Sequence, residues 1–234
     1  MISVPRHYTG RLIVLDDPKA VGSEAFRTLR TNLQFASLNE ELVTISFTST
    51  GPNEGKSVIS SNLAVSIAQT GTKVILMDCD LRKPAVHRIF GLRNTVGLTT
   101  VLTGEASLES ALQDTRCKNL QVLTAGPIPP NPAELLQSKA MEKTISEIRH
   151  FADKVLIDAP PVLPVADAMI LASYVDGIVF VVGAQLAPKD MARRAKEQLE
   201  STNTRILGVV LNKVKYDRGS EHYYYYYRPS EQDG

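Results

Sequence analysis

A short run rich in glycine, lysine and serine constrains the fold of this chain more than any other feature. It reads TGPNEGKS, and it follows residues 43–49, which predict a buried strand, and precedes residues 57–69, which predict a helix. A glycine-containing turn between a strand and a helix is the setting in which backbone N–H groups bind phosphate. The binding residues predicted from this run are Gly51, Pro52, Asn53, Glu54, Gly55, Lys56, Ser57 and Val58.

Two side chains of this loop have predicted roles in binding a nucleoside triphosphate. The Lys56 ammonium reaches the outer phosphates, and the Ser57 hydroxyl binds Mg²⁺. We expect Lys56 to lie at a surface cleft, so that its replacement by methionine spares the fold. Thr50 stands where the strict pattern has glycine, and a chance Gly-Lys-Ser turn is the alternative. Because both flanking elements are predicted, the sequence favours a site for ATP with Mg²⁺.

Acidic residues end two further predicted strands. KVILMDCD places Asp78 and Asp80 at the end of one strand, and KVLIDAPP places Asp158 at the end of another. Ligands bind at the carboxyl ends of strands in open α/β sheets. Asp78 and Asp80 point to the same side if their strand stays extended. A cap or turn explains each acid alone, but three acids together with Ser57 predict a Mg²⁺ site in which one aspartate accepts a proton.

Other polar residues near these strand ends leave two interpretations open. Arg82 and Lys83 follow Asp80 and either contact phosphate or form a solvated turn. Asn212 ends the last predicted strand, where it either hydrogen-bonds adenine or serves as a turn residue.

Short runs rich in valine and isoleucine alternate with longer amphipathic segments along the chain. This pattern predicts an α/β fold with a doubly wound, mostly parallel sheet flanked by helices, as in P-loop NTPases. Residues 1–215 form the predicted domain, and residues 216–234 form a mobile tail. The predicted strands are 43–49, 73–79, 121–124, 154–158, 177–182 and 205–211, and the predicted helices are 23–37, 57–69, 132–151 and 188–201.

Charge and apolar content limit the partners to be expected. With 26 basic and 25 acidic residues the chain has a formal net charge of +1, so no nucleic-acid partner is expected. Its two cysteines, Cys79 and Cys117, lack metal-ligand spacing and are expected to be reduced. The most apolar run, 178–184, is far shorter than the roughly 20 residues of a membrane helix. We therefore expect a soluble cytoplasmic protein that reaches a membrane only through a partner.

Two segments remain ambiguous on spacing alone. Glu24, Arg27 and Arg30 share one face of the predicted helix 23–37, where a solvated surface with one local ion pair is the simplest interpretation. Five consecutive tyrosines, Tyr223, Tyr224, Tyr225, Tyr226 and Tyr227, lie in the polar C-terminal stretch. A packed or aggregation-prone strand is the alternative there, but the flanking glycine, serine, proline and acidic residues argue against it.

The motifs together resemble those of bacterial tyrosine kinases, the BY-kinases that accompany capsule and exopolysaccharide synthesis, in their separate-chain form. GPNEGKS resembles the Walker A motif of that family, ILMDCD its Walker A′ motif and VLIDAPP its Walker B motif; GPIPPNPAELL at 126–136 is also similar. The resemblance implies that Lys56 stabilises phosphate charge, that Ser57 and Asp158 serve Mg²⁺, and that Asp78 and Asp80 position metal and activate a tyrosine hydroxyl. Asn53 departs from the family, which usually has glycine there.

The same resemblance implies roles for the ambiguous segments. Glu24, Arg27 and Arg30 match a helix that joins subunits in a ring, and Tyr223–Tyr227 match a C-terminal autophosphorylation cluster. It also implies other protein substrates phosphorylated on tyrosine, and a membrane adaptor of the polysaccharide chain-length-determinant type that recruits the kinase to the inner face of the cell membrane.

Two alternatives to a kinase that regulates capsular or exopolysaccharide synthesis remain at this stage. The first is an ATPase switch without phosphoryl transfer, similar to chromosome-partitioning or septum-positioning proteins. Those proteins typically carry an additional lysine near the start of the loop, and Thr50-Gly51-Pro52 has none. The second alternative is a nucleotide-dependent scaffold for polysaccharide machinery.

Overall fold

Seven strands form one sheet in the computed structural model, which describes residues 12–36 and 42–214. The strand order is β3-β4-β2-β5-β1-β6-β7, and all neighbours are parallel except the antiparallel pair β3 and β4. The predicted doubly wound, mostly parallel sheet is confirmed. The strands are β1 (Thr44–Ser49), β2 (Val74–Asp78), β3 (Leu112–Asp114), β4 (Leu120–Leu123), β5 (Lys154–Asp158), β6 (Gly177–Gly183) and β7 (Ile206–Asn212).

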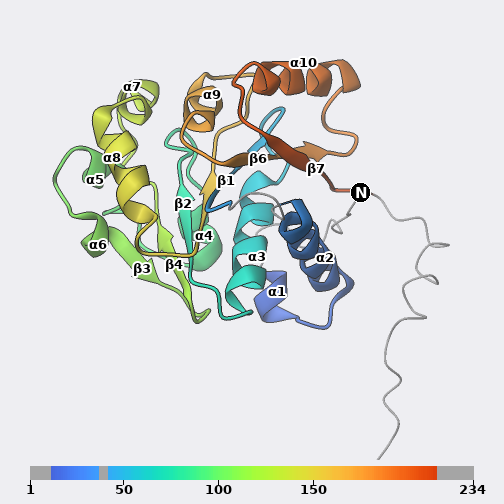
Figure 1. Cartoon of the computed structure of the whole chain (residues 1–234), viewed down its shortest axis with the longest axis horizontal. Coiled ribbons are helices and arrows are strands. Elements are labelled where there is room, and N and C mark those ends of the chain that lie inside the picture. Colours follow the sequence, from blue (N-terminus) through green and yellow to red (C-terminus); the bar gives the residue numbers. More distant parts are fainter. Residues whose placement is uncertain (1–11, 37–41, 215–234) are drawn as a thin grey trace, which may run out of the picture.

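Helices cover both faces of the sheet because successive strand residues point in opposite directions. In β2, Val74 and Leu76 join one apolar cluster, whereas Ile75 and Met77 join another. Figure 1 shows the helices of the first cluster and those of the second on opposite sides of the strands. The first face carries α1 (Ile13–Asp16), α2 (Val21–Ala36), α3 (Lys56–Ala68) and α4 (Val86–Phe90); the second carries α5 (Leu98–Leu102), α6 (Leu108–Ala111), α7 (Pro132–Leu136) and α8 (Lys139–Ile148).

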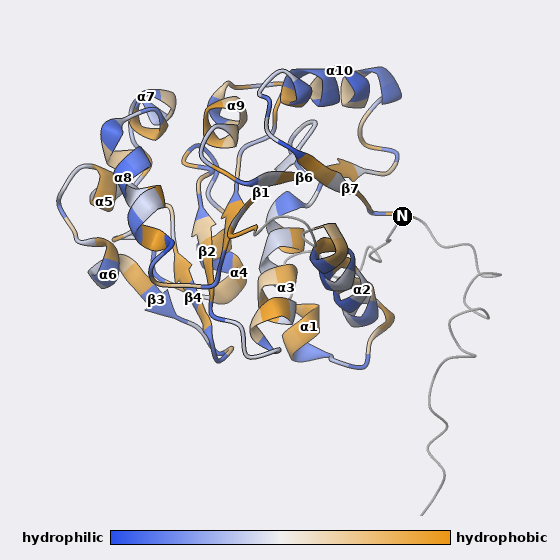
Figure 2. Cartoon of the chain, in the orientation of Figure 1, coloured by the Kyte–Doolittle hydropathy of each residue, from blue (hydrophilic) through white to orange (hydrophobic). Residues whose placement is uncertain are grey.

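A third apolar cluster joins β6 to α9 (Asp167–Ala172) and α10 (Lys189–Glu200). Only Ala195 and Leu199 of α10 are buried, and the hydrophilic residues on the rest of that helix are evident in Figure 2. No helix in the described residues is long and apolar enough to cross a membrane.

The predicted helix 132–151 is wrong in one respect, because the structure divides it into α7 and α8. The Ser138 hydroxyl accepts a hydrogen bond from the Met141 N–H at 3.2 Å and begins the second helix as its N-cap. Asn131 does precede Pro132 at the start of α7, as predicted. Its side chain, however, donates to the Glu134 carboxylate instead of capping the helix.

The carboxyl ends of β1, β2 and β5 meet at one edge of the sheet. Asp78 of β2 is in register with Asp158 of β5, and Phe47 of β1 pairs with Asp158 from the other side. The loop that follows β1 leads into α3 and therefore lies beside both acidic strand ends. The fold thus brings together the three motifs that the sequence separates by about 100 residues.

Candidate active site

The phosphate loop has a backbone conformation that only a few residue types tolerate. Gly55 has a φ of 97°, and a Cβ atom at this position would lie 2.1 Å from Asn212 Nδ2. Asn53 has a φ of 63°. Asparagine is one of the few residues with a side chain that enters this left-handed region readily. The replacement of the family's usual glycine by Asn53 is therefore compatible with the loop.

The ends of β6 and β7 hold the loop from outside. The buried Glu54 carboxylate accepts hydrogen bonds from Gly51 N–H at 2.5 Å and from Gly183 N–H at 2.7 Å. Burial raises the pKa of Glu54, although these two hydrogen bonds oppose the rise. Asn212 Nδ2 donates to the Glu54 carbonyl at 2.8 Å, and Lys213 Nζ donates to the Asn53 carbonyl at 2.5 Å. The side chain of Asn212 is thus committed to the loop and buried within the protein.

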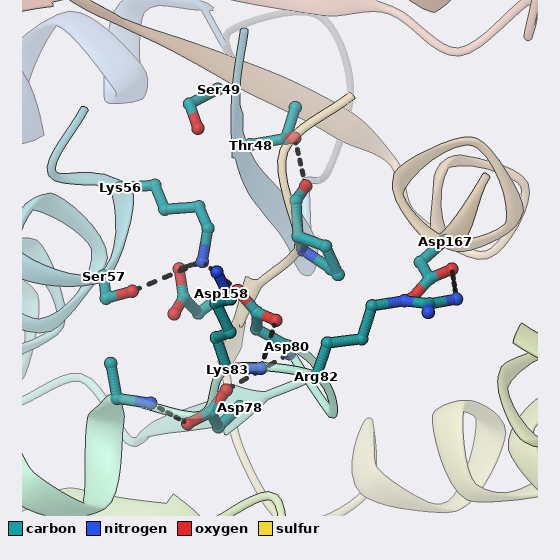
Figure 3. Close-up of polar contacts among 12 residues, drawn as sticks. Thr48, Ser49, Lys56, Ser57, Asp78, Asp80, Arg82, Lys83, Asp158 and Asp167 are labelled. Carbon is teal, nitrogen blue, oxygen red and sulfur yellow. Dashed lines mark hydrogen bonds and ion pairs between the residues drawn. The ribbon is translucent and has the colours of Figure 1, made fainter. Parts of the chain in front are cut away.

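Lys56 lines an open cleft, as expected, but its side chain is mostly buried among carboxylates, which the sequence did not indicate. It is 10% exposed, and its Nζ lies 2.8 Å from Asp80 Oδ2 and 3.5 Å from Asp158 Oδ1. Figure 3 shows this cluster beside Ser57. Burial disfavours the charged ammonium, but the negative charges of Asp158 and Asp80 outweigh it, so the pKa of Lys56 lies above its ordinary value.

Asp158 has acceptor capacity that the protein leaves unused. Its side chain is fully buried, and neither carboxylate oxygen accepts a hydrogen bond from the described residues. Burial raises its pKa, and the Lys56 ammonium offsets this only in part. The described residues contain no group of three or more histidine, cysteine, aspartate or glutamate side chains arranged to hold a metal. Mg²⁺ at nucleotide sites keeps water and phosphate oxygens as ligands, so the Asp158 carboxylate, with its unused acceptor capacity and with Ser57 beside it, fits this ion.

Asp78 and Asp80 face different surroundings. The strand β2 ends at Asp78, and the chain turns so that Asp80 N–H donates to Asp78 Oδ1 at 3.2 Å. The prediction that Asp78 and Asp80 point to the same side required a strand that stays extended through Asp80, and this strand ends at Asp78. Asp78 Oδ2 accepts from the N–H groups of Ala85 and Val86 at 3.1 and 3.0 Å. Burial and the charge of Asp158 raise the pKa of Asp78 to about 7.

Asp80, in contrast, lines an open cleft of about 630 Å³. Its Oδ2 accepts from Lys56, and its Oδ1 accepts from the Lys83 N–H at 3.0 Å. Among the three acidic residues, Asp80 alone contributes to the lining of this cleft. The walls are formed by the phosphate loop, by residues 82–89 and by residues 160–165, with Lys213 at the rim.

Sequence reasoning missed the buried partner of Arg82. Its Nε and Nη2 donate to the two oxygens of Asp167 at 2.8 and 3.0 Å, and the Asp167 side chain is fully buried (Figure 3). The ion pair joins residues 85 positions apart, so no local pattern indicates it. The LRKP segment is therefore not a simple solvated turn, because Arg82 is paired with a buried carboxylate.

No residue of the helix α2 lines this cleft, and the tyrosine cluster lies outside the described residues. Arg27 pairs with Glu24 at 2.7 Å, as the predicted local ion pair requires. Arg30 was expected on the same solvated face, but its Nη1 donates to the Ser66 carbonyl at 2.6 Å and ties α2 to α3. The predicted phosphoacceptors Tyr223–Tyr227 lie outside the described residues.

Similarity to known proteins identifies the family. A ParA family model, described as NUBPL iron-transfer P-loop NTPase, matches residues 44–228. The tyrosine-protein kinase YwqD of Bacillus subtilis (strain 168) is 48% identical over 214 residues, which cover 92% of this chain and 90% of YwqD. The putative tyrosine-protein kinase CapB of Staphylococcus aureus is 40% identical over 215 residues, covering 92% and 94% of the two chains. The chain belongs to the bacterial tyrosine kinase family.

Solved structures place this tyrosine kinase in the same group. The chimerical protein CapA2B2 aligns with a TM-score of 0.88 at 39% identity, over 92% of the kinase and 94% of the chimera. The kinase domain of Escherichia coli tyrosine kinase ETK aligns with a TM-score of 0.85 at 31% identity, over 93% of each chain. The septum site-determining protein MinD of Pyrococcus horikoshii OT3, at 24% identity and a TM-score of 0.65, shows the fold alone. The predictions of a P-loop NTPase fold and of a protein-tyrosine kinase are confirmed, and the ATPase-switch alternative has less support.

Proposed function

We propose that this kinase transfers the γ-phosphoryl group of MgATP to the cluster Tyr223–Tyr227 of another copy of the chain and thereby regulates capsular or exopolysaccharide synthesis. One observation carries the proposal. Lys56 is held between Asp80 and Asp158 at the floor of the cleft, directly after the phosphate loop. A phosphoryl-transfer site needs a cation, an acid that organises Mg²⁺ and an acceptor for the hydroxyl proton, and the cluster contains all three.

The residues of the cleft have different roles in this reaction. Bound MgATP supplies the phosphoryl group, and its metal neutralises part of the phosphate charge. Lys56 and the backbone N–H groups of the loop hold the phosphates, while Ser57 and Asp158 would hold the metal. Asp80 lines the cleft and accepts the proton as the tyrosine oxygen bonds to phosphorus; the bond between phosphorus and the bridging oxygen breaks, and ADP leaves. Asp78 positions the segment that follows Asp80.

We further propose that the kinase assembles into a ring and is recruited to the inner face of the membrane by an adaptor of the polysaccharide chain-length-determinant type. Glu24 and Arg27 support the first part, because both lie on the outer side of α2. Arg30 supports it indirectly, since it fixes α2 on the helix that begins at Lys56. The residues after 215 act as the tail that carries the acceptor tyrosines, and other proteins are phosphorylated on tyrosine by the same cleft.

Incubation of the purified chain with MgATP tests the activity. Phosphotyrosine on the chain, detected by mass spectrometry, supports the kinase. Release of free phosphate without phosphotyrosine would instead support the ATPase switch. If neither product forms, even with the cytosolic segment of a candidate adaptor added, the scaffold alternative is favoured.

A mixing experiment tests transfer between subunits. A Lys56→Met chain with its tyrosines intact is combined with an active chain in which Tyr223–Tyr227 are all changed to phenylalanine. We expect phosphotyrosine on the Lys56→Met chain, since only that chain offers the acceptor cluster. The unmodified chain is labelled in parallel as a control, and circular dichroism checks that the Lys56→Met chain is folded. A blank but folded Lys56→Met chain beside a labelled control would refute transfer between subunits.

A further inference from the structure

Two chain segments that line the cleft, in addition to the phosphate loop and Asp80, contribute apolar groups. Ala85 and Ile89 come from one segment, and Pro160, Pro161, Pro164 and Val165 come from the other. An aromatic ring with a polar tip suits such a place, because its apolar body is buried while its hydroxyl reaches a polar partner. We call these two segments, residues 82–89 and 160–165, the acceptor half.

The charges of the acceptor half are almost entirely positive. Arg82, Lys83 and Arg88 belong to it, and the acid that lines the rest of the cleft is Asp80, which already accepts from Lys56. Arg82 is neutralised by the buried Asp167. Within residues 12–36 and 42–214, no ion pair involves Lys83 or Arg88, and both residues are exposed. We call Lys83 and Arg88 the basic edge.

The backbone that carries the basic edge is held by hydrogen bonds to Asp80 and Asp78. Asp80 Oδ1 accepts from the Lys83 N–H at 3.0 Å, and Asp78 Oδ2 accepts from the N–H of Val86 at 3.0 Å, two residues before Arg88. Figure 3 shows the Lys83 backbone beside the Asp80 carboxylate. The side chains of Lys83 and Arg88 therefore extend from a backbone that is held at a fixed position relative to Asp80, the proposed proton acceptor. Such preorganisation reduces the entropy that binding must overcome.

We propose that the basic edge binds negative charge next to the acceptor tyrosine, so that the kinase prefers a tyrosine segment that already carries phosphate. The occupant is the segment 219–230 of a second copy, and the inference rests on the proposed function. In that segment Glu221 precedes the tyrosine run and Arg228 follows it directly, so the unmodified run offers little negative charge. Each phosphate adds about −1.5 to −2 charges at neutral pH.

Arginine binds phosphate through two parallel N–H bonds, which makes Arg88 the principal contact. The first transfer to a tail is then the slowest, because the acceptor half meets a nearly neutral segment. Later transfers to the same tail are faster, because a neighbouring phosphate is present to bind the basic edge. Multiply phosphorylated tails accumulate at the expense of singly phosphorylated ones.

Two synthetic peptides of residues 219–230 test this preference. Both keep Tyr224 as the single acceptor and have phenylalanine at the other tyrosine positions, except that one peptide has phosphotyrosine at position 226. Initial rates are measured by mass spectrometry over ranges of peptide and of MgATP concentration for the parent kinase, Arg88→Gln and the double variant Lys83→Gln/Arg88→Gln. Arg194→Gln is the matched control, because Arg194 is exposed on α10 and does not line the cleft.

For the parent we expect kcat/KM to be about fivefold higher on the phosphopeptide, the effect of an exposed pair of about 1 kcal/mol. Arg88→Gln reduces this ratio, the double variant brings it near one, and Arg194→Gln leaves it unchanged. Equal rates of the parent on both peptides would overturn the inference. So would a double variant with a raised KM for ATP and an unchanged ratio of kcat/KM between the two peptides, because the basic edge would then bind the nucleotide. Failure of the parent to phosphorylate either peptide would count against the proposed function instead.

Discussion

Replacing Lys56 by methionine should destabilise the folded protein as well as stop phosphoryl transfer. The Lys56 side chain is 10% exposed and lies within 3.5 Å of two carboxylates, so the change breaks a buried ion pair and leaves negative charge without its cation. Removal of one partner from a buried pair typically costs about 3–5 kcal/mol of unfolding free energy. We expect a loss of that size at pH 7.5, together with a loss of phosphotyrosine formation of about 100-fold or more.

The destabilisation should depend on pH with a defined sign. Burial already raises the pKa of Asp158 and of Asp78, and loss of the Lys56 charge raises both further. The folded variant then binds more protons than the unfolded chain between about pH 4, where free aspartates ionise, and the raised pKa values of these two aspartates. Its stability therefore falls more steeply than that of the parent as the pH rises from about 4 to 7, and the two proteins differ least at acidic pH.

Urea unfolding followed by circular dichroism, without nucleotide, measures these differences at pH 4.5, 6.0 and 7.5. Asp80→Asn supplies the control in both backgrounds. In the parent it should destabilise, because it weakens the pair with Lys56; in the Lys56→Met chain it should stabilise, because it removes an unpaired charge. A Lys56→Met protein within about 0.5 kcal/mol of the parent at pH 7.5, with no change of sign for Asp80→Asn, would refute the reasoning.

Three further predictions follow from single contacts. Gly55→Ala should lower the free energy of unfolding by about 2–4 kcal/mol and weaken nucleotide binding, because the new Cβ would clash with Asn212 and residue 55 has a left-handed backbone conformation. A stable variant with a normal nucleotide titration would contradict this. The raised pKa of Asp78 predicts that the parent loses stability as the pH rises from about 4 to 7 and that Asp78→Asn flattens this slope, whereas an unchanged slope in urea unfolding would oppose it. Arg30→Ala should cost about 1.5–3 kcal/mol, and Arg27→Ala at most about 1 kcal/mol; equal losses on unfolding would show that Arg30 does not anchor α2.

The sheet could be predicted from the sequence because most of its strands are buried on both faces. Strands such as β2 and β5 are short apolar runs that end in an acid, and their pattern does not depend on distant residues. The antiparallel strand β3 was missed because it has three residues, all at least partly exposed, and no apolar run. The break between α7 and α8 was missed because the apolar spacing continues on both sides of it, while the only local signal is the capping Ser138.

The members of the candidate site could be predicted, but their individual surroundings could not. Motif spacing indicated Lys56 from the loop between β1 and α3, and it indicated Asp78, Asp80 and Asp158 because each ends a strand or lies just after one at the ligand-binding edge. Their burial depends on how the chain packs after those strands end. The bond from Val86 N–H to Asp78, for example, distinguishes a carboxylate that holds backbone from one that faces the cleft.

The turn after β2 links the two halves of the cleft through one side chain. Asp80 Oδ2 accepts from Lys56, the proposed phosphate-binding cation, and Asp80 Oδ1 accepts from the Lys83 N–H of the proposed acceptor half. Any change in its charge therefore acts on the phosphate-binding cation and on the basic edge at the same time. A loss of activity in Asp80→Asn would combine the loss of the proposed proton acceptor with both of these effects, so it would not measure any one of them. Among the described residues the Arg88 side chain makes no hydrogen bond to Asp78 or Asp80, so its substitution tests the proposed acceptor half separately.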